Sequence, residues 1–158
     1  LCDCPEAKAA SYIFPIFHKH FVEMSLVESL LKWLNTFPSL GSTPITELQQ
    51  LSDGVVMAQV LRLIDSNFFQ MNLMDSTTNA RIKANNLKKV LNAVKDFYVE
   101  VLFLQLEAFP VPDIADVIEC DKEATGRMLQ LILGCAINCA QKQEYIQVIM
   151  GKRDMRLK

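Results

Sequence analysis

The stretch Gly126–Met150, GRMLQLILGCAINCAQKQEYIQVIM, decides the fold. From Met128 to Ala140 its only polar residues are Gln130 and Asn138, so a helix formed here is apolar on nearly every side. Such a helix lies buried among other helices. A helix over residues 128–140 rises only about 20 Å, and it is shorter than the roughly 20 residues that a helix needs to cross a bilayer. The stretch therefore predicts a buried central helix and not a membrane anchor.

The second half of this stretch mixes polar with apolar residues, and it predicts that the same helix leaves the core half exposed. Gln143, Ile146, Gln147 and Met150 recur at positions i, i+3, i+4 and i+7, so they share one helix face. A face of glutamine and apolar side chains suits a groove for an amphipathic partner helix. The alternative is that Ile146 and Met150 pack on the first helix of the same domain.

Composition narrows the class of protein. The 158 residues, 51% of them hydrophobic, suit one globular domain. A formal net charge of -2 gives no global attraction to nucleic acid or acidic membranes, and the aromatic residues do not alternate with basic ones as in a base-stacking surface. The five cysteines are an odd number, which favours a reducing, intracellular compartment over a disulfide framework. We expect neither a nucleic-acid partner nor membrane insertion.

The rest of the chain predicts helices and no convincing strand, because β-type alternation is missing and few glycines mark hairpins. Residues 68–79 carry no helical period and predict a loop. The expected fold is an all-α bundle of about six or seven helices with a long C-terminal helix. The expected elements are a helix from Leu26 to Phe37 stopped by Pro38, a short helix opened by Thr43-Pro44 and running through Leu48, a helix capped by Ser52 or Asp53 and ending before Asp65, a helix from about Ala80 to Val99, a short helix Ile114–Ile118 capped by Asp113, and the long final helix capped by Asp121.

No catalytic constellation emerges, and we predict no cofactor and no catalytic residue. Both histidines lie in residues 1–23, a segment that reads as a poorly ordered or non-native leader. Its Cys and His pairs have one residue between possible ligands, whereas structural zinc pairs usually have two to four, so we expect no metal. Cys135 and Cys139 could form a metal or redox pair, but within an apolar run they are more typical of small core residues. Trp33 is interpreted as a core anchor of the first helix.

A basic cluster is the other candidate site. Arg81, Lys83, Lys88 and Lys89 place four positive charges within nine residues without an acid among them. They lie largely opposite the apolar stripe of their helix. The cluster is either an ordinary solvated face or a contact for an acidic filament surface, whose strength would fall with salt.

Four segments resemble the N-terminal domain of the Hook proteins, which are microtubule-linked adaptors that activate dynein. They are LLKWLNTF (30–37), LSDGVVMAQVLRLID (51–65), NARIKANNLKKVL (79–91) and, most specifically, residues 126–150. The first three are shared with calponin-homology domains generally. The resemblance implies a calponin-homology-like bundle with an extra C-terminal helix over residues 24–150.

The resemblance also implies partners and location. It implies binding to a helix of the dynein light intermediate chain and to microtubules, in the cytoplasm and at the centrosome. Full-length family members continue into a dimeric coiled coil and a cargo-binding tail, which are absent here. Arg81, Lys83, Lys88 and Lys89 match the family's basic helix, whereas the basic tail, residues 151–158, diverges where the family's groove continues.

Two alternatives from other classes remain. An actin-binding calponin-homology domain usually occurs in tandem, and 158 residues leave no room for a second copy. A small thiol or metal enzyme would need a reactive Cys135 and Cys139, or a functional leader. We predict a non-catalytic adaptor domain.

Overall fold

The computed structural model describes residues 26–40, 43–74, 78–105 and 110–139. These residues contain five α-helices, two 3-10 helices and no strand, in agreement with the predicted all-α class. The leader, the basic tail and the expected partner-helix face lie outside the described residues. The elements are α2 (Leu26–Leu34), η1 (Pro38–Leu40), η2 (Leu48–Leu51), α3 (Val55–Ile64), α4 (Ala80–Glu100), α5 (Ile114–Ile118) and α6 (Lys122–Ile137).

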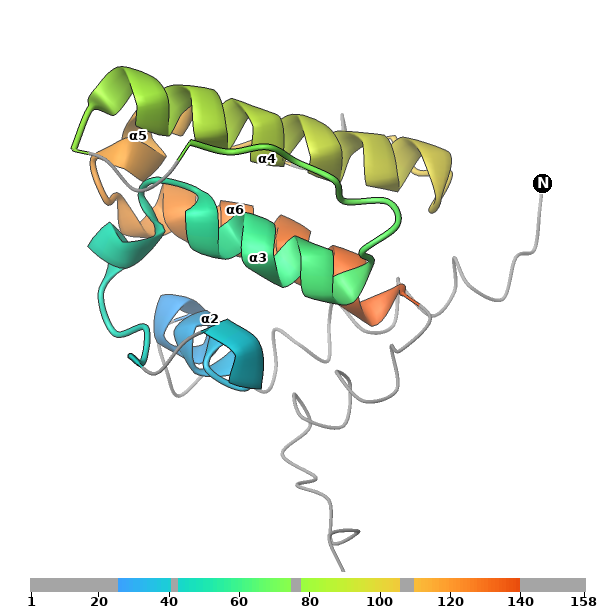
Figure 1. The fold of residues 1–158 in the computed structure, drawn as a ribbon, viewed down its shortest axis with the longest axis horizontal. Helices are drawn as coiled ribbons and strands as arrows, with labels where there is room; N and C mark the ends of the chain where they lie inside the picture. The colour runs from blue at the N-terminus through green and yellow to red at the C-terminus, as the bar shows by residue number, and fades with distance from the viewer. Residues whose placement is uncertain (1–25, 41–42, 75–77, 106–109, 140–158) are drawn as a thin grey trace, which may run out of the picture.

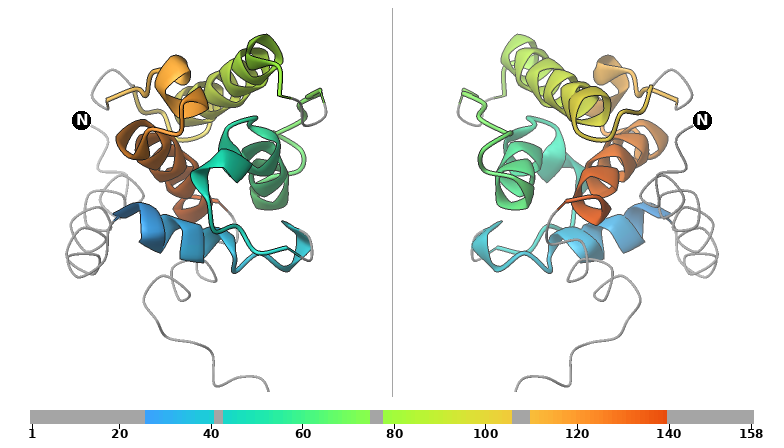
Figure 2. Two further views of the ribbon diagram at one scale, coloured as in Figure 1. Left: turned by 90° about the vertical axis from the view of Figure 1, so that its left-hand side faces the viewer. Right: turned by 90° about the vertical axis from the view of Figure 1, so that its right-hand side faces the viewer.

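Helix α6 lies at the centre of the bundle, as the sequence predicted. In Figure 1 it lies behind α3, with α4 on one side and α2 on the other, and the side views of Figure 2 show the same arrangement. It contacts α2, α3, α4 and α5. Eleven of its 16 residues are buried, including Met128, Leu129 and Ile132, which are 0% exposed. The apolar character of this stretch is therefore explained by neighbours on most of its sides.

Aromatic side chains pack the segments that follow α2 and α3 against the helices. Trp33 of α2 is 4% exposed and packs edge to face against Phe37, with ring centroids 5.3 Å apart, which confirms its role as a core anchor. Phe69 stacks on Phe97 of α4 at 5.2 Å, and Phe68 meets the same ring edge-on at 5.3 Å. The region after α3 is non-helical wherever it is described, as predicted, and these rings hold its start against α4.

The prediction of a short helix that begins at Thr43-Pro44 is wrong. Residues 44–46 are not helical, and the first helical turn after Pro44 is η2, which begins at Leu48. The side chain of Asn35 accepts a hydrogen bond from the Ile45 N–H and donates one to the Ile45 carbonyl, both at 2.8 Å. The Asn35 side chain supplies hydrogen-bond partners for both the N–H and the carbonyl of Ile45. These backbone groups therefore do not need the hydrogen bonds of a helix.

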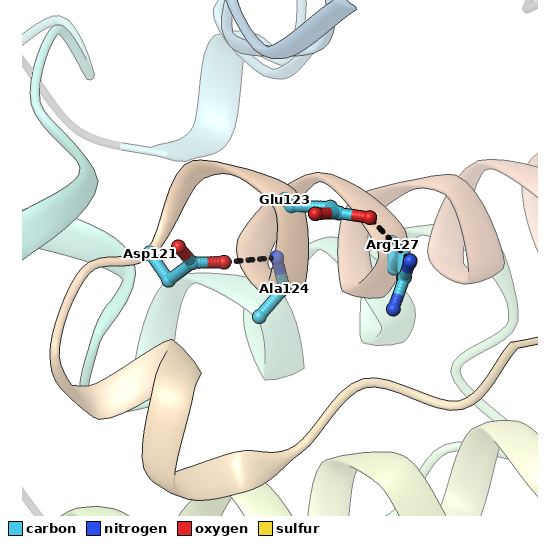
Figure 3. Close-up of polar contacts among 4 residues, drawn as sticks. All are labelled: Asp121, Glu123, Ala124 and Arg127. Carbon is cyan, nitrogen blue, oxygen red and sulfur yellow. Dashed lines mark hydrogen bonds and ion pairs between the residues drawn. The ribbon is translucent and has the colours of Figure 1, made fainter.

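The predicted caps are confirmed at two helices and corrected at a third. Asp113 accepts from Ala115 N at 2.9 Å, and Asp121 accepts from Ala124 N at 2.8 Å (Figure 3). At α3 the capping residue is Gly54, not Ser52 or Asp53. Its φ of +76° suits glycine, and an added β-carbon would lie 3.3 Å from the Leu87 side chain. The Asp53 carboxylate still accepts from Val55 N at 3.0 Å.

The final helix is long, as predicted, but it does not run unbroken to Met150. Helix α6 ends at Ile137. The Asn138 side chain donates to the Gly134 carbonyl at 2.7 Å, and its backbone N–H bonds three residues back, to Cys135, at 3.3 Å. This side-chain bond and the tightened turn end the regular i to i−4 ladder.

Candidate functional site: the basic face of helix α4

The positive charge of the domain is concentrated in one helix. The first sixteen residues of α4, residues 80–95, contain five cations and no acid, whereas its two acids, Asp96 and Glu100, fall in its last five residues. Two cations, Arg81 and Lys83, lie near the N-terminus, where the helix dipole disfavours positive charge by roughly 0.3–1 kcal/mol. Helix stability therefore does not account for their position. The five cations are Arg81, Lys83, Lys88, Lys89 and Lys95.

Two of the five cations bind the domain itself. The Lys83 ammonium donates to the Ser52 hydroxyl at 3.1 Å, which ties α4 to the start of α3. The Lys89 ammonium donates to the Asn72 carbonyl at 2.8 Å, which ties α4 to the segment that follows Phe69. Both lysines therefore have a structural role. The sequence pattern alone could not distinguish these two lysines from cations that are available to a partner.

The other three cations form a row on the surface. Arg81, Lys88 and Lys95 occupy positions i, i+7 and i+14, so they share one face and follow one another at about 10 Å along the helix. Arg81 and Lys88 are exposed and Lys95 is partly exposed. Within the described ranges none of the three charged side chains makes a hydrogen bond or ion pair, whereas the Arg127 side chain on α6 pairs with Glu123 (Figure 3). The sequence analysis missed Lys95, although its seven-residue spacing from Lys88 was a readable signal.

This row can act on an extended polyanionic surface. Its opposite face is held rigidly, because Leu87, Val90 and Val94 are 0% exposed. The spacing of about 10 Å is close to the Debye length at physiological salt, about 8 Å. On such a surface each cation would interact mainly with its own anionic neighbour, and this interaction would weaken as salt increases.

Comparison with known proteins decides the family. The HOOK domain model matches residues 25–156, which is more than half of the chain. The chain belongs to the Hook family. The Hook domain is 45% identical over 131 residues to Protein Hook homolog 1 of Danio rerio and 47% identical over 131 residues to Protein Hook homolog 3 of Homo sapiens. In both cases the match covers 79% of this chain and 18% of the relative.

A solved structure agrees with the fold. The solution structure of the conserved domain of HOOK1 from mouse matches this Hook domain with a TM-score of 0.72 and 41% identity. The match covers 84% of this chain and 82% of that chain. The resemblance read from the four sequence segments is confirmed.

Among the described residues, Ser52 and Lys83 form a Ser–Lys pair, and these residue types can support nucleophilic catalysis. The Ser52 hydroxyl is 1% exposed and donates to the Gln49 carbonyl at 2.8 Å. A buried hydroxyl already committed to the backbone cannot reach a substrate, so the pair is a structural contact. In the described ranges no group of three or more His, Cys, Asp or Glu side chains could hold a metal ion.

The thiols of α6 and its following turn are core residues. Cys135 is 0% exposed and Cys139 is 7% exposed. Burial, and then the neighbouring Cys139, raise the pKa of the Cys135 thiol well above its ordinary value. A buried, protonated thiol is a poor nucleophile and a poor metal ligand, which agrees with the packing role predicted for this pair.

The second predicted site, the partner-helix face of Gln143, Ile146, Gln147 and Met150, lies outside the described residues. It remains a prediction from the sequence. No helix in the described part of the Hook domain has the length and hydrophobicity needed to span a bilayer.

Proposed function

We propose that this Hook domain is a non-catalytic adaptor module that links cargo to microtubules and cytoplasmic dynein in the cytoplasm and at the centrosome, for intracellular transport and microtubule organisation. Membership of the Hook family supports the class. The chain spans 18% of the length of the relatives it matches. In line with the family resemblance, we assign cargo binding and dimerisation to other parts of such proteins.

One observation carries the microtubule contact. The row of Arg81, Lys88 and Lys95 has no described partner within the domain, although the whole chain has a net charge of -2. Solvated cations that stabilise nothing internally are available to an anionic lattice, where they raise the rate and selectivity of encounter. Lys83 and Lys89 contribute to the same field, but their ammonium groups already bind Ser52 and Asn72.

The test is co-sedimentation with purified microtubules. The triple variant Arg81→Gln, Lys88→Gln, Lys95→Gln is expected to bind about tenfold more weakly or worse, and to lose much of the salt dependence. A single variant, Lys88→Gln, should also bind more weakly. Its matched control is Lys122→Gln, which removes one exposed charge from α6 and should bind like the unmodified chain. Unchanged binding by the triple variant would refute the row as the contact. An equal effect of the triple variant on actin filaments would favour a generic polyanion contact, or the actin-binding alternative.

The dynein contact is the second part of the proposal. The face of Gln143, Ile146, Gln147 and Met150 has the composition of a wet groove for an amphipathic helix. The sequence predicts a divergence from the family at Gly151, although the HOOK domain match extends to residue 156. We propose that this face is the part of the groove that the chain retains. We expect weak binding to a helix of the dynein light intermediate chain.

A pull-down with that helix as a synthetic peptide tests this second contact. It compares the present chain with one in which a family-like continuation follows Met150. Binding by the extended chain alone supports a groove that is completed beyond Met150. Equal, strong binding by both chains would show that the groove is complete without the extension, and binding by neither would argue against the dynein contact.

A further inference from the structure

Thr43 and Pro44 form the single Ser/Thr-Pro dipeptide of the chain. Although their sequence predicted a helix start, the structure places both on the surface, outside any helix. The Thr43 hydroxyl makes no hydrogen bond to any described residue. The side chain is therefore available to an external partner.

The backbone that follows Thr43 is non-helical and is hydrogen-bonded to neighbouring segments of the domain. A proline restricts the residue before it to the β or polyproline region. Beyond Pro44, the side chain of Asn35 bonds both backbone groups of Ile45 at 2.8 Å, as a neighbouring strand would. The Gln50 amide donates to the Pro44 carbonyl at 3.3 Å. The buried Ile45 side chain anchors the segment, so Thr43 lies two residues from a side chain that is fixed in the core.

Other hydroxyl groups do not combine these features. Ser29, Ser52 and Thr125 are buried, and Thr36 donates to the Trp33 carbonyl at 2.6 Å. Thr46 is exposed, but an acid follows it where Thr43 has a proline. Within the described residues, Thr43 alone joins an exposed hydroxyl to a following proline.

We propose that Thr43 is a phosphorylation site for a proline-directed Ser/Thr kinase, a role beyond the adaptor function. A kinase binds its substrate in an extended conformation. An apolar slot of the kinase for the residue after the acceptor would bury the backbone N–H of that residue without a hydrogen-bond partner. Proline has no N–H to leave unpaired. In the transfer, a bond forms between Thr43 Oγ1 and the γ-phosphorus of ATP, and the bond to the β–γ bridging oxygen breaks. ADP leaves, and the hydroxyl proton passes to the catalytic aspartate of the kinase.

The site accommodates the modification without disturbing the fold. The Asn35 and Gln50 bonds begin one residue after the acceptor and use no atom of its side chain. A phosphate adds a charge of about −1.5 to −2 at pH 7, comparable to the formal net charge of -2 on the whole chain. The modification would thus nearly double the formal net negative charge of the chain.

The test treats the folded chain with Mg-ATP and a proline-directed kinase, and locates the phosphate by intact and tandem mass spectrometry. We expect one phosphate on Thr43. Incorporation should fall at least about tenfold in Thr43→Ala and in Pro44→Ala, because each removes one element of recognition. Thr46→Ala, the matched control three residues away, should incorporate as much as the unmodified chain.

Three results would overturn the proposal. They are an absence of phosphate on the folded chain, persistence of phosphate in Thr43→Ala, and phosphorylation only after denaturation, since the last would show that the fold hides the site. Thermal melting of each variant establishes that it is folded. Thr43→Ala should melt like the unmodified chain, because the Thr43 hydroxyl makes no hydrogen bond to a described residue.

Discussion

The hydroxyl of Tyr98 on α4 lies directly against Gly134 on α6. It donates a hydrogen bond to the Leu131 carbonyl at 3.0 Å, in a buried position between the two helices. A β-carbon on residue 134 would lie 1.8 Å from the tyrosine oxygen and 3.0 Å from the ring carbon that carries it. Glycine inside a helix costs about 1 kcal/mol relative to alanine, so its presence here is explained by the close approach of Tyr98.

Gly134→Ala should therefore destabilise the domain by about 2–3 kcal/mol, because the overpacked tyrosine must move and its hydrogen bond is strained or lost. This reverses the usual effect of a glycine-to-alanine change in a helix. The free energy of unfolding in urea, followed by circular dichroism, measures it. Adding Tyr98→Phe, which removes the clashing oxygen, should restore part of the loss.

Gly126→Ala is the matched control on the same helix. Its β-carbon would lie 3.3 Å from a methyl of Val27, a side chain that can shift, and the helix gains up to about 1 kcal/mol of propensity. The net change should stay within about 1 kcal/mol. If both alanine variants lost the same stability, the Tyr98 contact would not be the reason for Gly134.

Stability should fall in alkaline solution. Burial, and then the nearby Cys135, raise the pKa of Tyr98 far above its ordinary value, and burial raises that of Cys135. In the unfolded chain these groups lose their protons near pH 10 and pH 8.5, about their ordinary values. Above those values the folded chain binds more protons than the unfolded chain, so the free energy of unfolding decreases as pH rises.

The expected slope is up to about 1.4 kcal/mol per pH unit above about pH 8.5, and up to about twice that above about pH 10. Urea titrations between pH 7 and pH 10.5, in a reducing buffer, measure it. In Cys135→Ala the first phase of the loss should disappear, whatever the stability of this variant at neutral pH. A flat profile in the unmodified chain would contradict the buried state of both groups.

Thr125→Val should stabilise the domain by about 1 kcal/mol. The Thr125 hydroxyl is buried in α6 and has no hydrogen-bond partner within the described ranges, and valine has nearly the same shape without the polar atom. Chemical denaturation checks the change. Thr125→Ser, which keeps the hydroxyl and removes the methyl group, should instead destabilise by about 1 kcal/mol. A destabilised valine variant would mean that the hydroxyl is satisfied.

Asn86→Ala should cost about 2 kcal/mol and release the segment before α4. The Asn86 side chain is 1% exposed, and its amide accepts from Met74 N at 3.2 Å and donates to the Met74 carbonyl at 3.0 Å. Amide hydrogen exchange at Met74 should accelerate in this variant. Asn85→Ala, at the exposed neighbouring position, should change stability by less than about 0.5 kcal/mol and leave that exchange rate unchanged.

The sequence by itself predicted the helices that depend on local signals. The caps at Asp113 and Asp121 and the start of α4 at Ala80 agree with the structure, because capping and helical periodicity act within a few residues. The burial of α6 was also predictable, since a helix that is apolar on nearly every side has only one stable place, among other helices. The family resemblance rested on the same stretches.

Only the tertiary structure decided the features that join residues distant along the chain. The Asn35 side chain hydrogen-bonds both backbone groups of Ile45, and Tyr98 on α4 requires glycine at position 134 on α6. Five cations share one helix, but contacts with Ser52 and Asn72 give two of them internal roles, and the side chains of the other three have no described partner. A pattern along the chain places side chains on a helix face. Which of those side chains form hydrogen bonds within the domain depends on the groups that folding brings against that face.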